Sequence, residues 1–305
     1  MAIARNGTCE LYYETFGNPS NPTLLMVNGL GSQSINFADE WVQMFVARGL
    51  HVIRFDNRDV GKSTWFDDAP VGEHGAAYLL PDMADDAVAV LDAAGVERAH
   101  VIGFSMGGMI VQQLAIDHAG RLSTATSVMS TTGEDGHGSS SKEAFALLTA
   151  KPATDRESYV QSQIAGLRVW GSPEFADEDR WRQVAEAAFD RGFHPSGTTR
   201  QFLAIRASGP RGEQLRSVSV PFLVVHGDKD TLIHSSGGRR TAELVPGAHF
   251  ELIEGMGHDH PPQLWDRLVD LVVAHTELSR RVAVCGTIRV EPAAGSILDG
   301  RGGEI

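Results

Sequence analysis

Residues 99–108 read Ala-His-Val-Ile-Gly-Phe-Ser-Met-Gly-Gly and hold one serine, Ser105, between two glycines at the spacing G-x-S-x-G. An apolar run precedes this turn and the amphipathic stretch 109–118 follows it, so the pattern predicts a strand, a sharp turn and a helix. A Cβ at Gly103 or Gly107 would collide with the neighbouring strand and helix. The turn lifts the serine hydroxyl above a helix N-terminus, where backbone N–H groups can hold an oxyanion. An ordinary strand-to-helix turn would fit the pentapeptide alone.

Candidate partners follow the serine in the order acid, then histidine, which is the order that a catalytic triad on this architecture requires. The apolar run 221–226 predicts a buried strand, and the carboxylates Asp228 and Asp230 come just after it. A second strand, 249–253, leads into a glycine-rich loop that carries His258. Neutral imidazole can take a proton from serine, and a carboxylate fixes its tautomer. Simple loop-capping and helix-capping roles are the alternative, but three matches in the right order favour a triad.

A glycine-rich loop upstream of the serine is a candidate for the oxyanion hole. The predicted strand 23–28 runs into the loop, which reads Asn-Gly-Leu-Gly-Ser over residues 28–32. This loop could supply one backbone N–H, and Met106, the residue after the nucleophile, could supply the other. A plain β-turn is the alternative for this loop taken alone.

With these motifs the chain resembles the α/β-hydrolase superfamily over about residues 5–278. Within it, the chain is most similar to the actinobacterial esterase-like group that includes aclacinomycin methylesterase. The stretches 51–63, 99–108 and 254–258 carry the resemblance. It implies the α/β-hydrolase fold, in which a mostly parallel sheet is flanked by helices and carries an inserted helical cap, and it implies serine esterase activity.

The resemblance also assigns roles, residue by residue. Ser105 matches the nucleophile, His258 the base and Asp230 the acid, while Leu30 and Met106 match the backbone donors of the oxyanion hole.

Other residues of the same loops fit the family pattern less well. Asp228 stands two positions too early to be the acid. His260 comes just before two prolines and is predicted to belong to the start of the next helix. Many relatives carry His-Gly where this chain has Asn28-Gly29. Because the oxyanion donors are backbone groups, hydrolysis should survive that change, whereas it weakens any transfer of substrate identity.

Composition bounds the partners and the compartment. The chain has 305 residues and a net charge of −13, which argues against nucleic acid and anionic membranes as primary partners. Cys9 and Cys285 form neither a metal-binding spacing nor a disulfide framework, so a cytoplasmic location is expected. Residues 1–7 lack the apolar segment of a signal peptide, and no membrane span is expected. We expect a small-molecule ester as substrate and no metal or cofactor; the sequence specifies no oligomeric state.

Alternating strand and helix patterns predict βαβ units and a mostly parallel sheet. An antiparallel edge strand is expected at 10–16, and helical periodicity is clear in 83–91 and 264–272. The further strands are expected at 23–28, 51–56, 99–104, 125–130, 221–226 and 249–253. The hydrolase core is predicted to comprise residues 1–133 and 214–280.

The chain between the strands at 125–130 and 221–226 is longer than one crossover helix needs. We predict that residues 134–213 form a helical cap, which would exclude water and shape the substrate pocket. Its helical patterns fall near 142–149, 155–169, 177–191 and 198–207. Most of its large aromatics are expected in the cap's own core and one or two in the pocket; they are Trp170, Phe175, Trp181, Phe189, Phe193 and Phe202.

Two further segments carry expectations of their own. The charged residues of the stretch 54–59 follow a strand, and a structural ion-pair network is favoured there over substrate binding. After a short apolar run the chain becomes glycine-rich and polar, so residues 281–305 are predicted to be a loosely ordered tail.

The sequence thus predicts a serine hydrolase that cleaves carboxylic esters through an acyl-enzyme. A dehalogenase or epoxide hydrolase of this superfamily would carry aspartate in place of Ser105. A cofactor-free haloperoxidase or perhydrolase would use the same triad, and cofactor-independent oxygenases and hydroxynitrile lyases share the fold, so these alternatives stay open. A non-catalytic ligand-binding protein is the alternative from another class, disfavoured because all three triad positions hold competent residues.

Overall fold

An eight-stranded sheet forms the centre of the molecule in the computed structural model, which describes residues 2–69, 72 and 75–285. The strand order is β1-β2-β4-β3-β5-β6-β7-β8; β2 is antiparallel to both of its neighbours and all other pairs are parallel. The strands are β1 (Ala2–Asn6), β2 (Cys9–Phe16), β3 (Thr23–Val27), β4 (His51–Phe55), β5 (Ala99–Phe104), β6 (Leu122–Val128), β7 (Phe222–Gly227) and β8 (His249–Ile253). The mostly parallel sheet confirms the fold class expected from the sequence.

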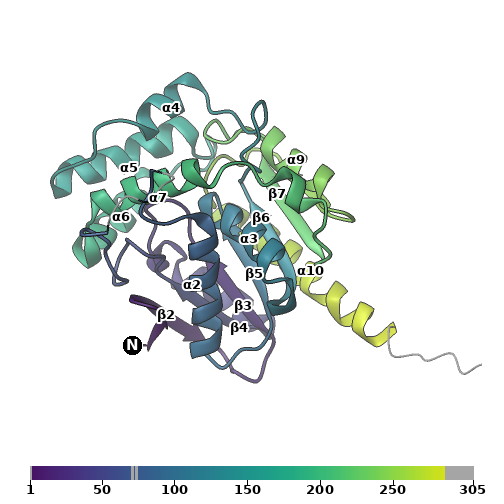
Figure 1. Cartoon of the computed structure of the whole chain (residues 1–305). Coiled ribbons are helices and arrows are strands. Elements are labelled where there is room, and N and C mark those ends of the chain that lie inside the picture. Colours follow the sequence, from purple (N-terminus) through teal and green to yellow (C-terminus); the bar gives the residue numbers. More distant parts are fainter. Residues whose placement is uncertain (1, 70–71, 73–74, 286–305) are drawn as a thin grey trace, which may run out of the picture.

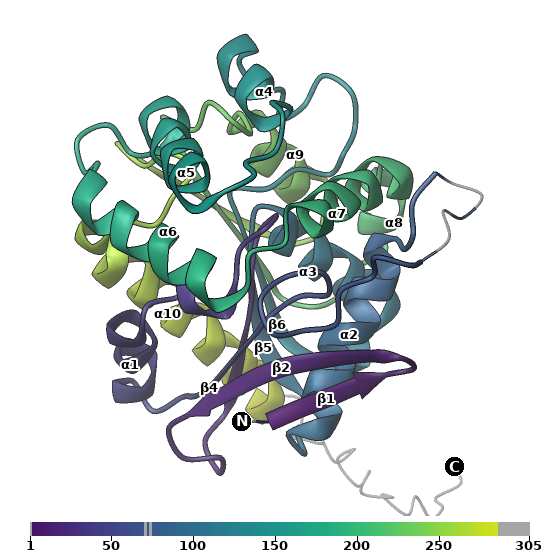
Figure 2. The same ribbon diagram turned by 90° about the vertical axis from the view of Figure 1, so that its left-hand side faces the viewer.

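Helices cover both faces of the sheet, as Figures 1 and 2 show. One apolar layer lies between the sheet and α2 and α3, and a second lies between the sheet and α1 and α10. The helices outside the β6–β7 connection are α1 (Asp39–Ala47), α2 (Leu80–Ala93), α3 (Met106–Asp117), α9 (Ser236–Leu244) and α10 (Trp265–Cys285), with short 3-10 turns η1 (Ser34–Asn36), η2 (Ala119–Arg121) and η3 (Pro262–Leu264). Strands β3 to β7 are buried on both faces, which explains their nearly continuous apolar sequences.

The edge of the sheet differs from the sequence prediction. The strand expected at 10–16 exists as β2, but it is an inner strand, because β1 pairs with it and forms the true edge. Gly7, at a φ of 57°, turns the chain between the two strands. The sequence of β1 alternates only weakly, with Ala4 buried and Ile3 largely exposed, so it carries little strand signal.

The chain between β6 and β7, residues 129–221, is called the inserted segment from here on. It contains α4 (Lys142–Leu148), α5 (Arg156–Trp170), α6 (Glu178–Gly192), α7 (Pro195–Ser208) and α8 (Gly212–Leu215). Side chains of Ser141, Asp155 and Asp177 accept N–H bonds from the first turns of α4, α5 and α6, which fixes where these helices begin. Figure 2 shows α4 to α7 gathered over one end of the sheet.

Part of the inserted segment has a small core of its own. Val160 and Ile164 of α5 pack against Ala185 of α6. The rings of Phe189 and Phe193 stack with centroids 4.5 Å apart, and Phe193 also contacts Tyr159. Two of the predicted cap aromatics therefore lie in this cluster. The division into a core and a cap stays a prediction at this point.

The C-terminal end of the chain differs from its prediction in one respect. Helix α10 continues through residues 281–285, where the loosely ordered tail was expected to begin. The remainder of that predicted tail, 286–305, lies outside the described residues. Within the described part of the chain, no helix combines the length and apolar character needed to cross a membrane.

Candidate active site

Ser105 sits at a strained turn between β5 and α3. Its φ is 55° and its ψ is −118°, a conformation that residues with a side chain rarely adopt. A Cβ built on Gly103 would lie 2.1 Å from the carbonyl oxygen of Gly107. One built on Gly107 would lie 2.1 Å from the carbonyl oxygen of Val27 on β3. Glycine is thus needed at both positions, as predicted, because a side chain there would overlap backbone atoms that cannot move aside.

We expect Gly107→Ala to destabilise the folded protein by about 3 kcal/mol or more, because the new methyl group would overlap backbone on β3. Denaturant unfolding measures this loss as a lower midpoint. Gly120→Ala is the matched control, since a Cβ at Gly120 meets no atom within 4 Å. Equal midpoints for the two variants would contradict the steric argument.

Strand pairing brings the loop after β3 against this serine. Val27 pairs with Gly103 in the parallel β3–β5 ladder, so both strands end at the same level. The order of the strands reverses between β3 and β5, and such switch points are where open α/β sheets bind ligands. A Cβ on Gly29 would lie only 3.3 Å from the Cβ of Ser105, so the loop touches the turn.

The backbone N–H groups of Leu30 and Met106 flank this contact. Leu30 follows Gly29 in the loop, and Met106 is the first residue of α3. Among the hydrogen bonds of the described residues, none uses either N–H group as a donor. Two unpaired donors beside a serine hydroxyl form the kind of site that stabilises a developing oxyanion.

Three side chains from separate loops form one hydrogen-bonded chain. Ser105 Oγ lies 2.9 Å from His258 Nε2, and His258 Nδ1 lies 2.7 Å from Asp230 Oδ2. An ionised carboxylate only accepts, so Nδ1 carries the proton and Nε2 is left to accept from the serine O–H. The structure therefore brings together the three residues that the sequence singled out, in the geometry needed to activate a serine.

The electrostatic setting of Asp230 keeps it charged. The carboxyl is almost fully buried, and burial alone would raise its pKa. A coulombic interaction with His258 and a hydrogen bond from His226 outweigh that effect and lower the pKa to about 2. Its other oxygen, Oδ1, accepts from the N–H groups of Leu232 and Ile233 at 2.9 and 2.8 Å. At neutral pH this carboxylate is ionised and cannot rotate freely, so it can orient the imidazole.

Sequence reasoning treated His226 only as the last residue of a strand, but in the structure its side chain contacts Asp230 and the turn that carries it. Its Nε2 lies 2.8 Å from the carbonyl oxygen of Ile233 and 3.3 Å from Asp230 Oδ2. The ring is fully buried at the end of β7. His226 thus fastens the turn that carries Asp230, a role that only the folded turn reveals.

Asp228 and His260, the alternative acid and the alternative histidine, make no hydrogen bond to Ser105, His258 or Asp230 among the described residues. Asp228 Oδ1 accepts from the N–H of Gly255 at 2.7 Å and so ties together the loops after β7 and β8. His260 is packed among aromatic rings, with its ring centroid 4.9 Å from that of Trp41 and 5.1 Å from that of Phe104. Burial of the imidazole lowers its pKa to about 4. Asp228 thus joins two loops, and His260 takes part in the aromatic packing.

The end of α5 is hydrogen-bonded to the loop that carries His258, a contact that sequence reasoning missed. The N–H of His258 donates to the carbonyl oxygen of Trp170 at 2.5 Å. Ser172 Oγ accepts from the N–H of Gly257 at 2.9 Å and donates to Asp259 Oδ1 at 2.5 Å. These contacts join residues more than 80 positions apart in the sequence, so no local sequence pattern predicts them.

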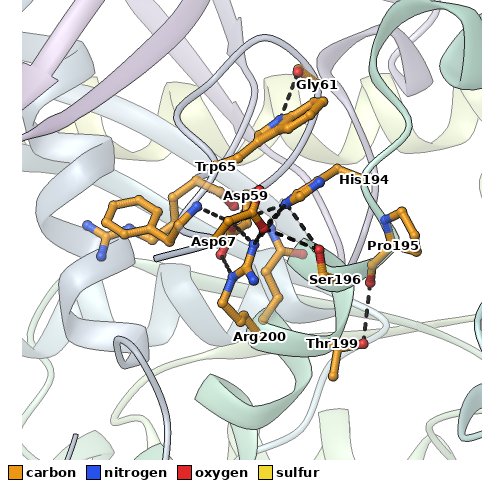
Figure 3. A network of polar contacts seen from close by, with 12 residues as sticks. Asp59, Gly61, Trp65, Asp67, His194, Pro195, Ser196, Thr199 and Arg200 are labelled. Atoms are coloured by element: carbon orange, nitrogen blue, oxygen red, sulfur yellow. Dashed lines mark hydrogen bonds and ion pairs between the residues drawn. The ribbon is translucent and has the colours of Figure 1, made fainter. Parts of the chain in front are cut away.

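The charged cluster after β4 forms ion pairs with the inserted segment. Asp56 Oδ2 lies 2.7 Å from Arg191 of α6, and both oxygens of Asp59 accept from Arg200 of α7 at 2.8 and 2.9 Å. Figure 3 shows Arg200 reaching Asp59 and also Asp67. This confirms the structural ion-pair interpretation of the stretch, and it adds that two of the pairs fasten the inserted segment to the sheet.

Comparisons with known proteins agree with this fold. A family model described as alpha/beta hydrolase fold matches residues 22–260. The rhodomycin D methylesterases DauP of Streptomyces sp. (strain C5) and DnrP of Streptomyces peucetius are each 30% identical to the chain; the alignments cover 87% and 89% of this chain and 94% and 96% of theirs. The crystal structure of an enol-lactonase from Burkholderia xenovorans LB400 shares the fold with a TM-score of 0.71 at 21% identity, covering 90% of this chain and 99% of that one. The resemblance inferred from the sequence is confirmed.

Proposed function

The chain belongs to the alpha/beta hydrolase family and is an esterase-type hydrolase, and we propose that it cleaves carboxylic esters through a covalent acyl-enzyme formed on Ser105. The observation that carries the proposal is the unbroken hydrogen-bonded chain from Ser105 Oγ through His258 to Asp230. Serine is a weak nucleophile until an adjacent base takes its proton. The arrangement supplies that base together with an ionised partner for it.

In the first half of the proposed reaction, Ser105 Oγ attacks the ester carbonyl carbon while His258 Nε2 takes the hydroxyl proton. The carbonyl oxygen becomes an oxyanion, and the N–H groups of Leu30 and Met106 stabilise it. Asp230 stabilises the imidazolium that has formed. The tetrahedral intermediate collapses, the ester C–O bond breaks, and His258 gives its proton to the leaving alkoxide, which departs as an alcohol.

In the second half, water replaces the alcohol. His258 Nε2 takes a proton from the water as it attacks the acyl carbon, and the same two N–H groups hold the second oxyanion. The Ser105 ester bond breaks, Oγ regains a proton from His258, and a carboxylic acid leaves.

We propose methyl esters of carboxylic acids as the substrate class. The support is that two relatives sharing 30% identity over most of the chain are named methylesterases. The matched region includes the inserted segment, since both alignments cover nearly the whole chain.

Hydrolysis assays with defined esters test this function. p-Nitrophenyl esters from acetate to octanoate report turnover and chain-length preference, methanol release from methyl esters reports the proposed alcohol, and rhodomycin D is one methyl ester to include. A fluorophosphonate should label Ser105. Labelling without turnover of any ester would support a ligand-binding role instead, and peracid formation from acetate and peroxide exceeding ester hydrolysis would support a perhydrolase. The cytoplasmic location expected from cysteine usage stays a prediction.

We further propose that residues 134–213 form a cap that lines the acyl or alcohol pocket. Phe175 and Trp181 line a small cavity, about 50 Å³, whose wall includes Asp259 next to the catalytic histidine. The loop of that histidine is hydrogen-bonded to the end of α5. Trp170 and Ser172 therefore contact the loop of His258 directly, and the cavity lined by Phe175 and Trp181 adjoins that loop through Asp259.

Substituting these aromatics should change ester preference. We expect Phe175→Ala and Trp181→Ala to alter the ratio of kcat/KM between octanoate and acetate esters by about 10–200-fold, because one methylene of pocket space has an effect of that order. The rate with acetate should change much less. Phe145→Ala, an exposed aromatic on α4, is the control. An unchanged ratio in both pocket variants would contradict the proposed lining.

A further inference from the structure

Gln201 is a fully buried polar residue on α7, in the contact between the inserted segment and the sheet. An amide in such a position destabilises the fold unless both of its ends are hydrogen-bonded. Both ends are bonded here, and neither partner belongs to the inserted segment. Oε1 accepts from the N–H of Gly31 at 2.8 Å, and Nε2 donates to the carbonyl oxygen of Arg58 at 2.8 Å.

The first of these bonds reaches the oxyanion loop. Gly31 directly follows Leu30, whose N–H is one of the two oxyanion donors in the proposed function. Gly29 and Gly31 flank Leu30, and Gly31 has a φ of 67°, so the loop backbone has little intrinsic preference for one orientation. Within the loop, the N–H of Ser32 donates to the carbonyl oxygen of Gly29 at 3.2 Å, which closes the turn but does not fix it to the sheet.

Helix α7 is itself held firmly enough to act as a support. Figure 3 shows Arg200, the residue before Gln201, bound to Asp59 through two hydrogen bonds and to Asp67 through another. A Cβ on Gly31 would lie 2.9 Å from Thr198 Oγ1, so α7 also packs directly against the loop. The position of the Gln201 amide is therefore fixed relative to the sheet.

We propose that Gln201 is a positioning residue that orients the oxyanion loop, so that the inserted segment takes part in building the oxyanion hole as well as covering it. This inference rests on the proposed function, because it needs the Leu30 N–H to bind the oxyanion. Hydrogen-bond donors stabilise an oxyanion only when they already point at its position. The bond from Gln201 to Gly31 supplies that orientation from outside the loop.

The test replaces Gln201 by methionine, which has a similar length and no hydrogen-bonding amide. We expect kcat for p-nitrophenyl acetate to fall about 10–100-fold, less than the roughly 100–1,000-fold loss on removing a donor itself. KM should stay within about twofold, since the loop contacts the transition state more strongly than the bound ester. The inhibition constant of a trifluoromethyl ketone, which forms an oxyanion adduct with the serine, should rise by the same factor as kcat falls. Thr199→Ala, on the exposed side of α7, should leave all three quantities unchanged.

Each other outcome is decisive. Wild-type kcat and inhibition constant in Gln201→Met would overturn the proposal, and so would a raised KM with unchanged kcat, because that would place Gln201 in substrate binding. If Gln201→Met fails to fold, Gln201→Asn, whose amide is one methylene short of Gly31, is judged by the same three quantities. Ser105→Ala separates this inference from the proposed function: ester turnover that survives Ser105→Ala refutes the function, whereas its loss together with a fully active Gln201→Met refutes only the role of Gln201.

Discussion

Ser105→Ala is expected to lower kcat for p-nitrophenyl acetate by about 1,000-fold or more while the protein stays folded. In the proposed mechanism this hydroxyl forms the acyl bond, and no other hydroxyl is hydrogen-bonded to His258 among the described residues. Members of a triad act as a unit, so the remaining groups cannot compensate. Steady-state hydrolysis measures the loss, and the thermal unfolding midpoint verifies that the fold is intact.

A buried serine outside the Ser105–His258–Asp230 chain of hydrogen bonds provides the control for this prediction. Ser127 lies on β6, and its Oγ has no hydrogen-bond partner. Removing an unpaired buried hydroxyl leaves no partner unsatisfied, so Ser127→Ala should fold and hydrolyse esters like the wild type. A fluorophosphonate should label Ser127→Ala and leave Ser105→Ala unlabelled. Near-wild-type hydrolysis by pure Ser105→Ala protein would refute the acyl-enzyme mechanism.

The parts of the site that the sequence could predict are those with short-range signatures. The turn at Ser105 is specified by glycines two positions away, whose absent side chains leave room for backbone 2.1 Å from where a Cβ would be. Asp230 and His258 each follow a strand within a few residues, and parallel strands bring their ends to one edge. Local pattern and strand direction together are enough to place these three residues near one another.

The parts that the sequence could not predict depend on contacts between distant segments. Ser172 and Gln201 each sit in an ordinary helical or turn context, and their roles come from partners 85 and 170 residues away. The edge strand β1 was missed for a related reason, because an edge strand has weak alternation and is defined by its neighbour. Pairing across the sheet and docking of the inserted segment are tertiary events that single-sequence periodicity does not encode.

These distant contacts bear on how substrate reaches the serine. The end of α5 is bonded to the loop of His258, the carbonyl oxygen of Val169 accepts from Thr231 of the acid loop at 2.7 Å, and α7 is bonded to the oxyanion loop. Moving the whole inserted segment away as one rigid lid would break its hydrogen bonds to the loops that carry His258, Asp230 and Leu30. We therefore expect access to come from local movement of side chains or of single helices, with these three anchors kept in place.

Asp230→Asn is expected to lower kcat/KM by about 1,000–10,000-fold, whereas Asp228→Asn should cost less than about threefold. Asparagine at 230 removes the charge that stabilises the imidazolium and can offer an N–H where His258 Nδ1 needs an acceptor. At 228, asparagine keeps an oxygen for the N–H of Gly255 and loses only a half-exposed ion pair with Lys229. Steady-state kinetics on the two variants, with unfolding midpoints as the check on folding, measure the difference.

The histidines form the same kind of pair, because His258 bonds to both other triad residues while His260 is enclosed by aromatic rings. His258→Ala should therefore abolish turnover with the fold kept, and His260→Ala should mainly lower the unfolding midpoint, since it leaves a cavity beside Trp41. Two outcomes in folded protein would contradict the assignment. If Asp228→Asn lowered kcat/KM more than Asp230→Asn, Asp228 would have to be the acid; if His260→Ala lowered it more than His258→Ala, His260 would have to be the base. In either case the hydrogen bonds of His258 would not be those that operate in catalysis.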